Sequence, residues 1–254
     1  MELFLNNFII GFFINFFLIF LFREYPIMTK SGWISAGTLG TLLWGSLGWQ
    51  GWISVVLYLV FGSLVTKLGF KYKNKLGIAE KRGGRRGPEN VFGSASTGLF
   101  LALMIKLNLA NLILLKVGFA ASFAAKLADT FGSEIGKRYG KNTFLITTFK
   151  KVKKGTEGAI SLEGTIASLF GSIFMSLVMM ILGFISIEKG FFVVSFSGFV
   201  ATIFESFIGA IFQDKFKISN EAVNAIQTSF AATIAILFYK LILPALQKNL
   251  FELH

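Results

Sequence analysis

The sequence lacks cysteine altogether, and its only histidine is the terminal residue His254. These absences exclude a cysteine nucleophile, a zinc site built from Cys and His, a Ser-His-Asp triad and acid–base catalysis by histidine. Any bound metal must therefore be a hard cation held by oxygen atoms, and magnesium is the one that we expect.

Charged residues and proline are also scarce. Only 15% of the 254 residues are charged and 3 are proline, whereas soluble domains carry about 25% charged residues. In contrast, 54% are hydrophobic, 31 are phenylalanine and the mean hydropathy is +0.69. This composition is typical of a helical membrane protein with several spans, and we predict a single polytopic membrane domain over residues 1–254.

The apolar runs predict an all-α bundle of about eight transmembrane helices, joined at the site by short, Gly-rich loops. The first run has no basic residues before it and no small-residue cleavage site after it, so we interpret it as a retained helix rather than a signal peptide. The expected spans cover residues 3–22, 33–47, 51–68, 91–107, 109–128, 162–187, 191–212 and 226–243.

The formal charge of +12 is distributed unevenly along the chain. Of the 25 Lys and Arg residues, 20 fall in the four loops at 23–32, 67–90, 126–160 and 213–217. Cytoplasmic loops of membrane proteins are enriched in Lys and Arg, so we expect these loops on the cytoplasmic side and both termini outside. We therefore expect a lipid bilayer and a phosphate-rich substrate as partners rather than nucleic acid, and we predict no particular oligomeric state.

The stretch 126–140 is the first candidate for chemistry. Asp129, Gly132 and Gly136 fall on one stripe of a helix, next to Lys126. A carboxylate beside a groove without side chains suits a magnesium ion that bridges phosphates. Alternatively, the glycines serve close helix packing, with the acids at the water interface. Glu134 is turned away from this stripe and could serve a neighbouring helix.

A second candidate is the basic turn KKVKKGTEGAISLE at 150–163. Gly155 and Gly158 allow backbone conformations that are closed to other residues, and backbone N–H groups with lysine side chains can hold an anion. The lysines equally suit contact with anionic lipid headgroups. Ser161 is a plausible N-cap for the next helix, and Glu163 in its first turn also suits the helix dipole. There is no Walker A pattern, so this is not a P-loop protein.

The third candidate is the loop EKRGGRRGPEN at 80–90. Arg82, Arg85 and Arg86 carry planar guanidinium groups that suit phosphate oxygens. The glycines between them are unnecessary in a loop that is merely basic, which favours phosphate binding. Glu89 and Asn90 could cap the next helix or reach a metal.

Finally, Glu205 lies within an apolar run, about 10 Å from its expected cytoplasmic end. A carboxylate in a span must be neutral, paired or bound to a metal. Asn220, Glu221 and Asn224 follow on the adjacent loop and helix start, where the first two could simply cap that helix.

These segments together carry a family resemblance. GGRRGPEN, ADTFGSEIGKRYGK, LITTFKKVKKGTEGAISLEGTIAS, ESFIGAIFQ and NEAVNAIQT resemble one polytopic membrane family, long labelled only as a domain of unknown function. That family includes the phytyl-phosphate kinases of tocopherol and phylloquinone synthesis. It is similar to the CTP-dependent phytol and dolichol kinases, which share an Asp-led Gly helix followed by a Lys and a Glu-Gly turn.

The resemblance implies transfer of the γ-phosphate of a nucleoside triphosphate, CTP by analogy, onto a prenyl or phytyl monophosphate with Mg²⁺ as cofactor. The isoprenoid tail would enter sideways from the bilayer. The expected site has Asp129, Lys150 and Glu157 as catalytic residues, Asp129, Glu134 and Glu163 as metal ligands, and Arg82, Arg85, Arg86, Lys126, Lys154, Gly155, Thr156 and Gly158 on the phosphates. The further candidates are Glu89, Asn90, Glu205, Asn220, Glu221 and Asn224.

Two other classes compete with this prediction. A transporter or flippase of an anionic lipid would also explain Glu205 and the basic loops, without nucleotide chemistry. A CDP-alcohol phosphotransferase expects several aspartates on adjacent turns, whereas this chain has only Asp129 and Asp214.

Overall fold

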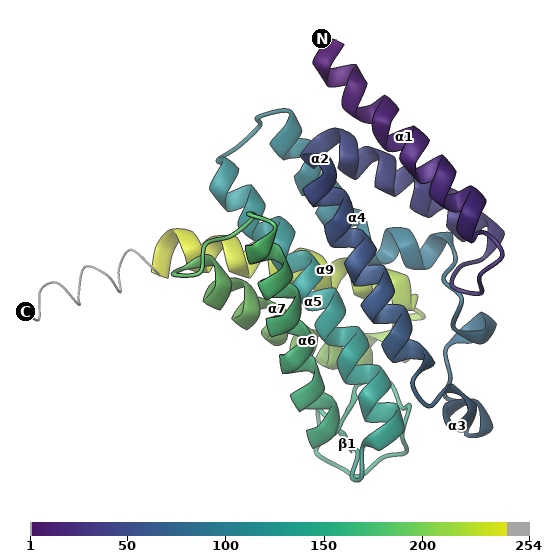
Figure 1. Ribbon diagram of the computed structural model, residues 1–254. Helices are drawn as coiled ribbons and strands as arrows, with labels where there is room; N and C mark the ends of the chain where they lie inside the picture. The colour runs from purple at the N-terminus through teal and green to yellow at the C-terminus, as the bar shows by residue number, and fades with distance from the viewer. Residues whose placement is uncertain (1, 243–254) are drawn as a thin grey trace, which may run out of the picture.

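The computed structural model describes residues 2–242, and helices dominate it (Figure 1). In chain order the helices are α1 (Glu2–Phe22), α2 (Lys30–Lys67), α3 (Phe70–Lys75), α4 (Pro88–Lys106), α5 (Leu112–Tyr139), α6 (Leu162–Ile181), α7 (Gly190–Ile208), α8 (Asp214–Phe216) and α9 (Asn220–Leu237). A 3₁₀ helix at Lys81–Gly84 precedes α4, and π-helical turns at Gly209–Gln213 and Phe238–Ile242 follow α7 and α9.

Helix α5 is the centre of the bundle and contacts α2, α4, α6, α7 and α9 (Figure 1). Its residues from Val117 to Ala128 are buried on every side, as expected of a helix that is covered all round. Many of them are alanines, so neighbouring backbones approach closely. Gly171 on α6 shows how closely, because an added Cβ would lie 3.0 Å from Ala128 Cα. Small residues at such contacts are typical of helix packing in membranes.

Helix α2 is long because it contains a sharp bend. Gly48 has φ 71° and ψ −164°, values outside the helical range, and the two halves of α2 run in different directions (Figure 1). Only glycine adopts this conformation readily. The two spans expected at 33–47 and 51–68 are therefore the two halves of one bent element.

The expected number of spans is tested only in part. Within residues 2–242, four helical segments are long and apolar enough to cross a membrane, at Lys30–Lys67, Leu162–Ile181, Gly190–Gln213 and Asn220–Leu241, and a shorter apolar helix covers Asn6–Phe22. Phenylalanines 12, 13, 16, 17 and 20 of α1 are exposed, as lipid-facing side chains are. A bundle of about eight spans remains a prediction.

The all-α prediction is confirmed, and the structure adds one short hairpin to it. In the second polar loop, β1 (Phe144–Leu145) pairs antiparallel with β2 (Ala159–Ile160), with Phe144 opposite Ile160. The pairing forms because Gly155 and Gly158, at φ 83° and 69°, turn the chain back on itself just before β2. Two residues per strand are too short to produce a readable alternation in the sequence.

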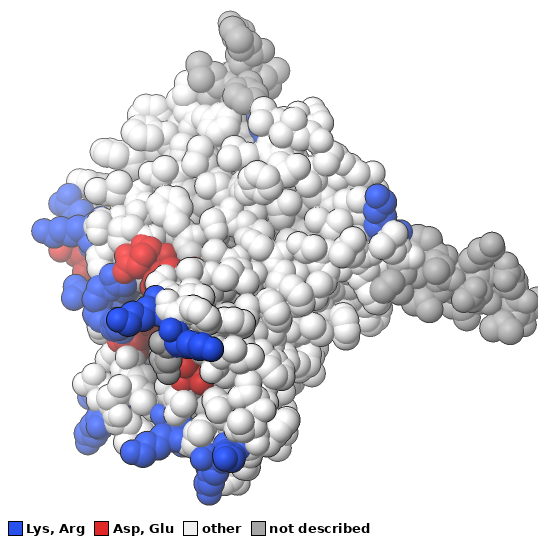
Figure 2. Space-filling view, turned by 180° about the vertical axis from the view of Figure 1, so that it is seen from behind, with Lys and Arg blue, Asp and Glu red and all other residues white. Residues whose placement is uncertain are grey.

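The charged residues gather at one end of the bundle. Figure 2 shows most of the Lys, Arg, Asp and Glu side chains on one part of the visible surface, while the remainder is almost uncharged. Residues from the three polar loops at 67–90, 137–159 and 213–219 line one shared cavity at this end. These loops therefore lie on the same side, as the charge pattern predicted, and their cytoplasmic location stays a prediction.

Candidate active site

The cavity at the charged end has a volume of about 890 Å³, which is ample for a nucleotide and a second phosphate group. It brings together nearly all the residues that the sequence singled out. They are Arg82, Arg85, Arg86, Glu89, Asn90, Lys126, Asp129, Glu134, Lys154, Gly155, Thr156, Glu157, Gly158, Glu205, Asn220, Glu221 and Asn224.

Two predicted residues do not line this cavity. Lys150 lies on the strand hairpin, where its carbonyl accepts a hydrogen bond of 2.9 Å from Leu145 N. Glu163 lies in the first turn of α6, and its Oε1 accepts a hydrogen bond of 3.2 Å from Lys141 N. This is the place expected from the helix-dipole interpretation of Glu163. Ser161 is the N-cap of α6, as predicted, since its side chain accepts from Gly164 N at 3.1 Å.

The glycines of the Asp129 stripe serve the packing of α5 against α6. A Cβ added to Gly132 would collide with Ser168 Oγ and lie 3.2 Å from Gly164 O. Gly132 and Gly136 also line the cavity. The same glycines therefore allow α5 to pack closely against α6 and leave Asp129 accessible from the cavity. Helix α5 continues as far as Tyr139, which keeps this stripe on one face.

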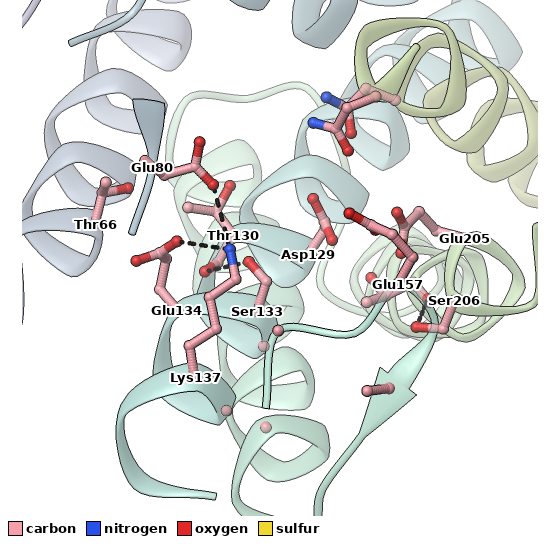
Figure 3. Close-up of a pocket in the computed structure, with 18 of the residues that line it drawn as sticks. Thr66, Glu80, Asp129, Thr130, Ser133, Glu134, Lys137, Glu157, Glu205 and Ser206 are labelled. Atoms are coloured by element: carbon pink, nitrogen blue, oxygen red, sulfur yellow. Dashed lines mark hydrogen bonds and ion pairs between the residues drawn. The ribbon is translucent and has the colours of Figure 1, made fainter. Parts of the chain in front are cut away.

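The stripe leads to a group of acids on one side of the cavity. Figure 3 shows Asp129, Glu157 and Glu205 directed toward the same space, from α5, from the turn before β2 and from α7. Asp129 forms an ion pair with Lys126, whose Nζ also donates to Asn224 Oδ1 at 2.7 Å. Lys126 is only 5% exposed, so this pair lies at the inner end of the cavity.

A different set of charges occupies the other side of α5. Glu134 is 2% exposed and forms an ion pair with the fully buried Lys73 of α3. Lys137 Nζ lies 3.6 Å from Glu134 Oε1 and 3.4 Å from Glu80 Oε1 (Figure 3). Burial alone would lower the pKa of Lys137, but the carboxylates of Glu134 and Glu80 outweigh it and raise that pKa. Glu134 therefore pairs with Lys73 and Lys137 and does not join Asp129 at the other acids of the cavity.

The arginine loop is held by short-range contacts. Arg82 forms an ion pair with Glu89 and donates to Asn90 Oδ1 at 2.6 Å. Asn90 Oδ1 also accepts a hydrogen bond of 3.0 Å from Gly87 N at the start of α4. Asn90 therefore caps this helix, which is one of the two roles that the sequence suggested for it. A hydrogen bond from its own backbone N–H lowers the pKa of Glu89, more than its slight burial raises it, and Arg82 lowers it further.

The turn at Gly155 and Gly158 is docked onto the end of α7. An added Cβ at Gly158 would lie 2.6 Å from Ser206 O and 2.8 Å from Ala210 Cα. Glycine is therefore required here both by its positive φ of 69° and by this close approach. Lys154 lies over the Tyr72 ring, with Nζ 5.8 Å from its centroid.

The three predicted metal ligands are not brought together. Within residues 2–242, no group of three His, Cys, Asp or Glu side chains is arranged to hold a metal ion. Glu134 is engaged by lysines and Glu163 lies outside the cavity, which leaves Asp129 beside Glu157 and Glu205. These carboxylates supply the oxygen donors that magnesium prefers, and magnesium commonly takes its other ligands from water and substrate phosphates.

The cavity lining is balanced in charge. Seven basic side chains, Lys81, Arg82, Arg85, Arg86, Lys126, Lys137 and Lys154, face seven acidic ones, Glu80, Glu89, Asp129, Glu134, Glu157, Glu205 and Glu221. A polyphosphate on its own would meet as many carboxylates as cations. This lining suits an anion that arrives together with a divalent cation.

The sequence reasoning missed several residues that lie at the cavity or next to its lining. Lys73 was one of eight basic residues in its loop, and nothing in the sequence marks it as the one that becomes buried. Lys137 and Glu80 likewise became significant only through their contact with each other. The hydroxyl groups of Thr66, Thr130 and Ser206 also line the cavity, and their residue types carry no specific signal, whereas Ser133 was expected beside Asp129 and lines the cavity too.

Comparison with known proteins identifies relatives over nearly the whole chain. Residues 13–237 match the family described as integral membrane protein DUF92. An uncharacterized membrane protein of Synechocystis is 45% identical over 227 residues, which is 88% of each chain. Protein VTE6, chloroplastic, of Arabidopsis thaliana is 44% identical over 222 residues, covering 85% of this chain and 66% of VTE6. An uncharacterized membrane protein of Methanocaldococcus jannaschii is 28% identical over 218 residues, 85% of this chain and 88% of the relative. No solved structure matches the chain.

Proposed function

The chain belongs to the integral membrane family DUF92, and on that basis we propose that it is a prenyl-phosphate kinase, with phytyl phosphate as the model acceptor. The reaction transfers the γ-phosphate of a nucleoside triphosphate, CTP by analogy, onto a prenyl monophosphate in the bilayer. The motif resemblance implies this activity, and the similarity to the plant protein VTE6 supports it.

The observation that carries the proposal is the convergence of three sequence motifs. The arginine loop, Asp129 and the Gly155–Gly158 turn line one cavity, although up to 76 residues separate Arg82 from Gly158 in the chain. Phosphoryl transfer depends on positioning and charge neutralisation more than on covalent catalysis. A cavity lined by guanidinium, ammonium and carboxylate groups is suited to both tasks.

In the proposed reaction an oxygen of the acceptor phosphate attacks the γ-phosphorus, and the bond from that phosphorus to the β,γ-bridging oxygen breaks. The products are the prenyl diphosphate and the nucleoside diphosphate. The acceptor is already an anion, so no strong general base is needed. Asp129 would hold Mg²⁺ together with water, substrate phosphates and at most one neighbouring carboxylate, Glu157 or Glu205, and the ion would neutralise the transferring phosphates when bound. Lys154, Thr156 and the Gly155–Gly158 turn would hold the donor phosphates.

The roles proposed for Lys150 and Glu163 are less direct. Neither side chain lines the cavity, because Lys150 lies on the strand hairpin and Glu163 in the first turn of α6. We therefore rank them below Asp129 and Glu157 as targets for mutation.

The proposal is tested by incubating membranes that contain the protein with γ-labelled CTP or ATP and a panel of prenyl monophosphates and prenyl alcohols. We expect label in a prenyl diphosphate, and label in a prenyl monophosphate would instead indicate an alcohol kinase. Asp129→Asn, which removes charge at constant size, should abolish transfer. Glu24→Gln is the matched control, because Glu24 is exposed and pairs only with its neighbour Arg23.

The same membranes distinguish the rival class. A transporter or flippase of an anionic lipid would move labelled prenyl phosphate across the bilayer without consuming nucleotide. Movement without any diphosphate product would overturn the kinase proposal.

A further inference from the structure

The three arginines of the 81–86 loop do not share one environment. Arg82 is exposed and neutralised by Glu89, and Arg85 is exposed, with Nε donating to Arg82 O at 3.1 Å. Arg86 instead reaches inward to α2. Its guanidinium carbon lies 5.2 Å from the centroid of the Tyr58 ring, and Nη1 donates to Tyr58 Oη at 2.9 Å. Tyr58 is only 4% exposed, so this contact lies well inside the bundle.

The fold fixes both the backbone and the side chain of Arg86. Its backbone N donates to Ile27 O and its backbone O accepts from Thr29 N, each at 3.0 Å. Its side chain passes across Gly62 on α2, where an added Cβ would lie 2.7 Å from Nη2. A glycine is therefore needed at position 62 for the guanidinium to reach its place. The head group is pre-organised, whereas an arginine that merely marks a cytoplasmic loop would remain in water.

Arg86 differs from Lys126 at the inner end of the cavity, because Lys126 pairs with Asp129 whereas no carboxylate of the described residues pairs with Arg86. Among the ion pairs found in residues 2–242, none includes Arg86, and its polar partner is the hydroxyl group of Tyr58. The second cation, Lys126, comes from α5 and lines the same cavity. Asp129 neutralises one of these two cations. Arg86 is half-buried and lines the cavity, so its guanidinium is within reach of an anion that enters there.

We propose that Arg86 and Lys126 form the subsite for the acceptor's phosphate monoester, while the donor nucleotide occupies the outer loops around Lys154 and the Gly155–Gly158 turn. This inference rests on the proposed function and deepens it, because it assigns the inner end of the cavity to one substrate. An alcohol acceptor would leave the Arg86 guanidinium without an anionic partner. A phosphate monoester supplies that partner and is held by a bidentate guanidinium.

The geometry also separates the two substrates by depth. Lys126, Asn224 and Ser94 lie at the inner end and are each less than 6% exposed, whereas Lys154 is half-buried and the Gly155 and Thr156 that follow it are exposed. A lipid-linked phosphate reaches the inner end from the bilayer, and a water-soluble nucleotide reaches the loops from solvent. Asp129 lies beside Lys126, between the two phosphates that must meet.

The test measures binding separately from catalysis. The full-length protein in nanodiscs is titrated with geranylgeranyl monophosphate and with geranylgeraniol without nucleotide, and separately with CTP. We expect Arg86→Gln to weaken monophosphate binding about 10- to 100-fold, the effect of losing charged hydrogen bonds, with unchanged affinity for CTP. Arg23→Gln is the matched control, because Arg23 is exposed, pairs with Glu24 and lies over the Phe20 ring, away from the cavity lining. Arg86→Lys, which keeps the charge, should recover part of the affinity.

The outcomes separate this inference from the proposed function. Monophosphate binding that depends on Arg86 in a protein that transfers no phosphate would support the subsite and overturn the kinase. Phosphate transfer with CTP affinity lost in Arg86→Gln, and monophosphate affinity retained, would overturn the subsite and leave the kinase. Equal binding of alcohol and monophosphate would also overturn it. Circular dichroism melting confirms that each variant is folded before it is compared.

Discussion

Replacing Lys73 with methionine removes one partner of the most deeply buried ion pair in the described part of the chain. Lys73 is fully buried and Glu134 is 2% exposed, and Lys73 Nζ also donates to Thr66 O at 2.8 Å. Removing one partner of such a pair costs about 3–5 kcal/mol, because the other charge stays buried and unneutralised. Lys137, 3.6 Å from Glu134, still neutralises it in part, so we expect a loss of about 3 kcal/mol.

The assay is thermal unfolding in detergent micelles, followed by the helical circular dichroism signal. For a chain of this size, about 3 kcal/mol corresponds to a melting temperature lower by about 6–12 °C. Lys71→Met is the matched control, since Lys71 lies on the same short helix with an exposed side chain. It should melt within about 2 °C of the unmodified protein, because an exposed substitution changes stability by roughly 0.5 kcal/mol or less.

A double variant tests the cause of this loss. Removing both charges, in Lys73→Met with Glu134→Gln, should cost less than the sum of the two single changes by about 1–3 kcal/mol, since neither charge is then left alone. Equal melting of Lys73→Met and Lys71→Met would refute the burial argument. Strict additivity in the double variant would refute the pairing argument.

Three further predictions follow from the described contacts. Gly158→Ala should abolish phosphate transfer in the membrane assay, because the added Cβ would meet Ser206 O and Ala210. Gly77 has the same φ of 69° but open space around it, so Gly77→Ala should retain transfer. Equal losses of transfer in the two variants would point to backbone strain alone. The pKa of Lys137 is raised in the fold, so the stabilisation that its charge provides is present at and below about pH 10.4 and is lost as the pH rises further. The difference in melting temperature between the unmodified protein and Lys137→Gln should therefore shrink above that pH and not below it. EDTA should stop the transfer of label and added magnesium restore it, while transfer that survives chelation would remove the metal from the mechanism.

Some of the site could be predicted from residue types alone. Glycines between arginines, glycines after Asp129 and glycines in a lysine-rich turn each mark a place where backbone and anions approach closely, and all three segments line the cavity. Glu205 was noticed because a carboxylate is costly inside an apolar run. These signals lie in short stretches of the sequence, so they can be recognised without knowledge of the fold.

The partners of individual charges could not be predicted in the same way. Glu134 and Asp129 are five residues apart, yet Glu134 meets Lys73 of α3 whereas Asp129 meets Lys126. The segment that joins α5 to α6 brings Lys141 N within hydrogen-bond distance of Glu163 Oε1. The two-residue strands that form the hairpin in this segment were likewise too short to recognise.

By itself, the sequence determined that this is an integral membrane protein of helices whose charged loops form one polar end, since hydrophobic run length and residue type depend on the chain alone. Only the tertiary structure decided that Arg86 enters the bundle while Arg82 remains outside, and that Glu134 pairs with Lys73 while Asp129 pairs with Lys126. The physical reason is that a charge is satisfied by whichever group the fold brings within a few ångströms, and that distance is set by the packing of helices far apart in the chain.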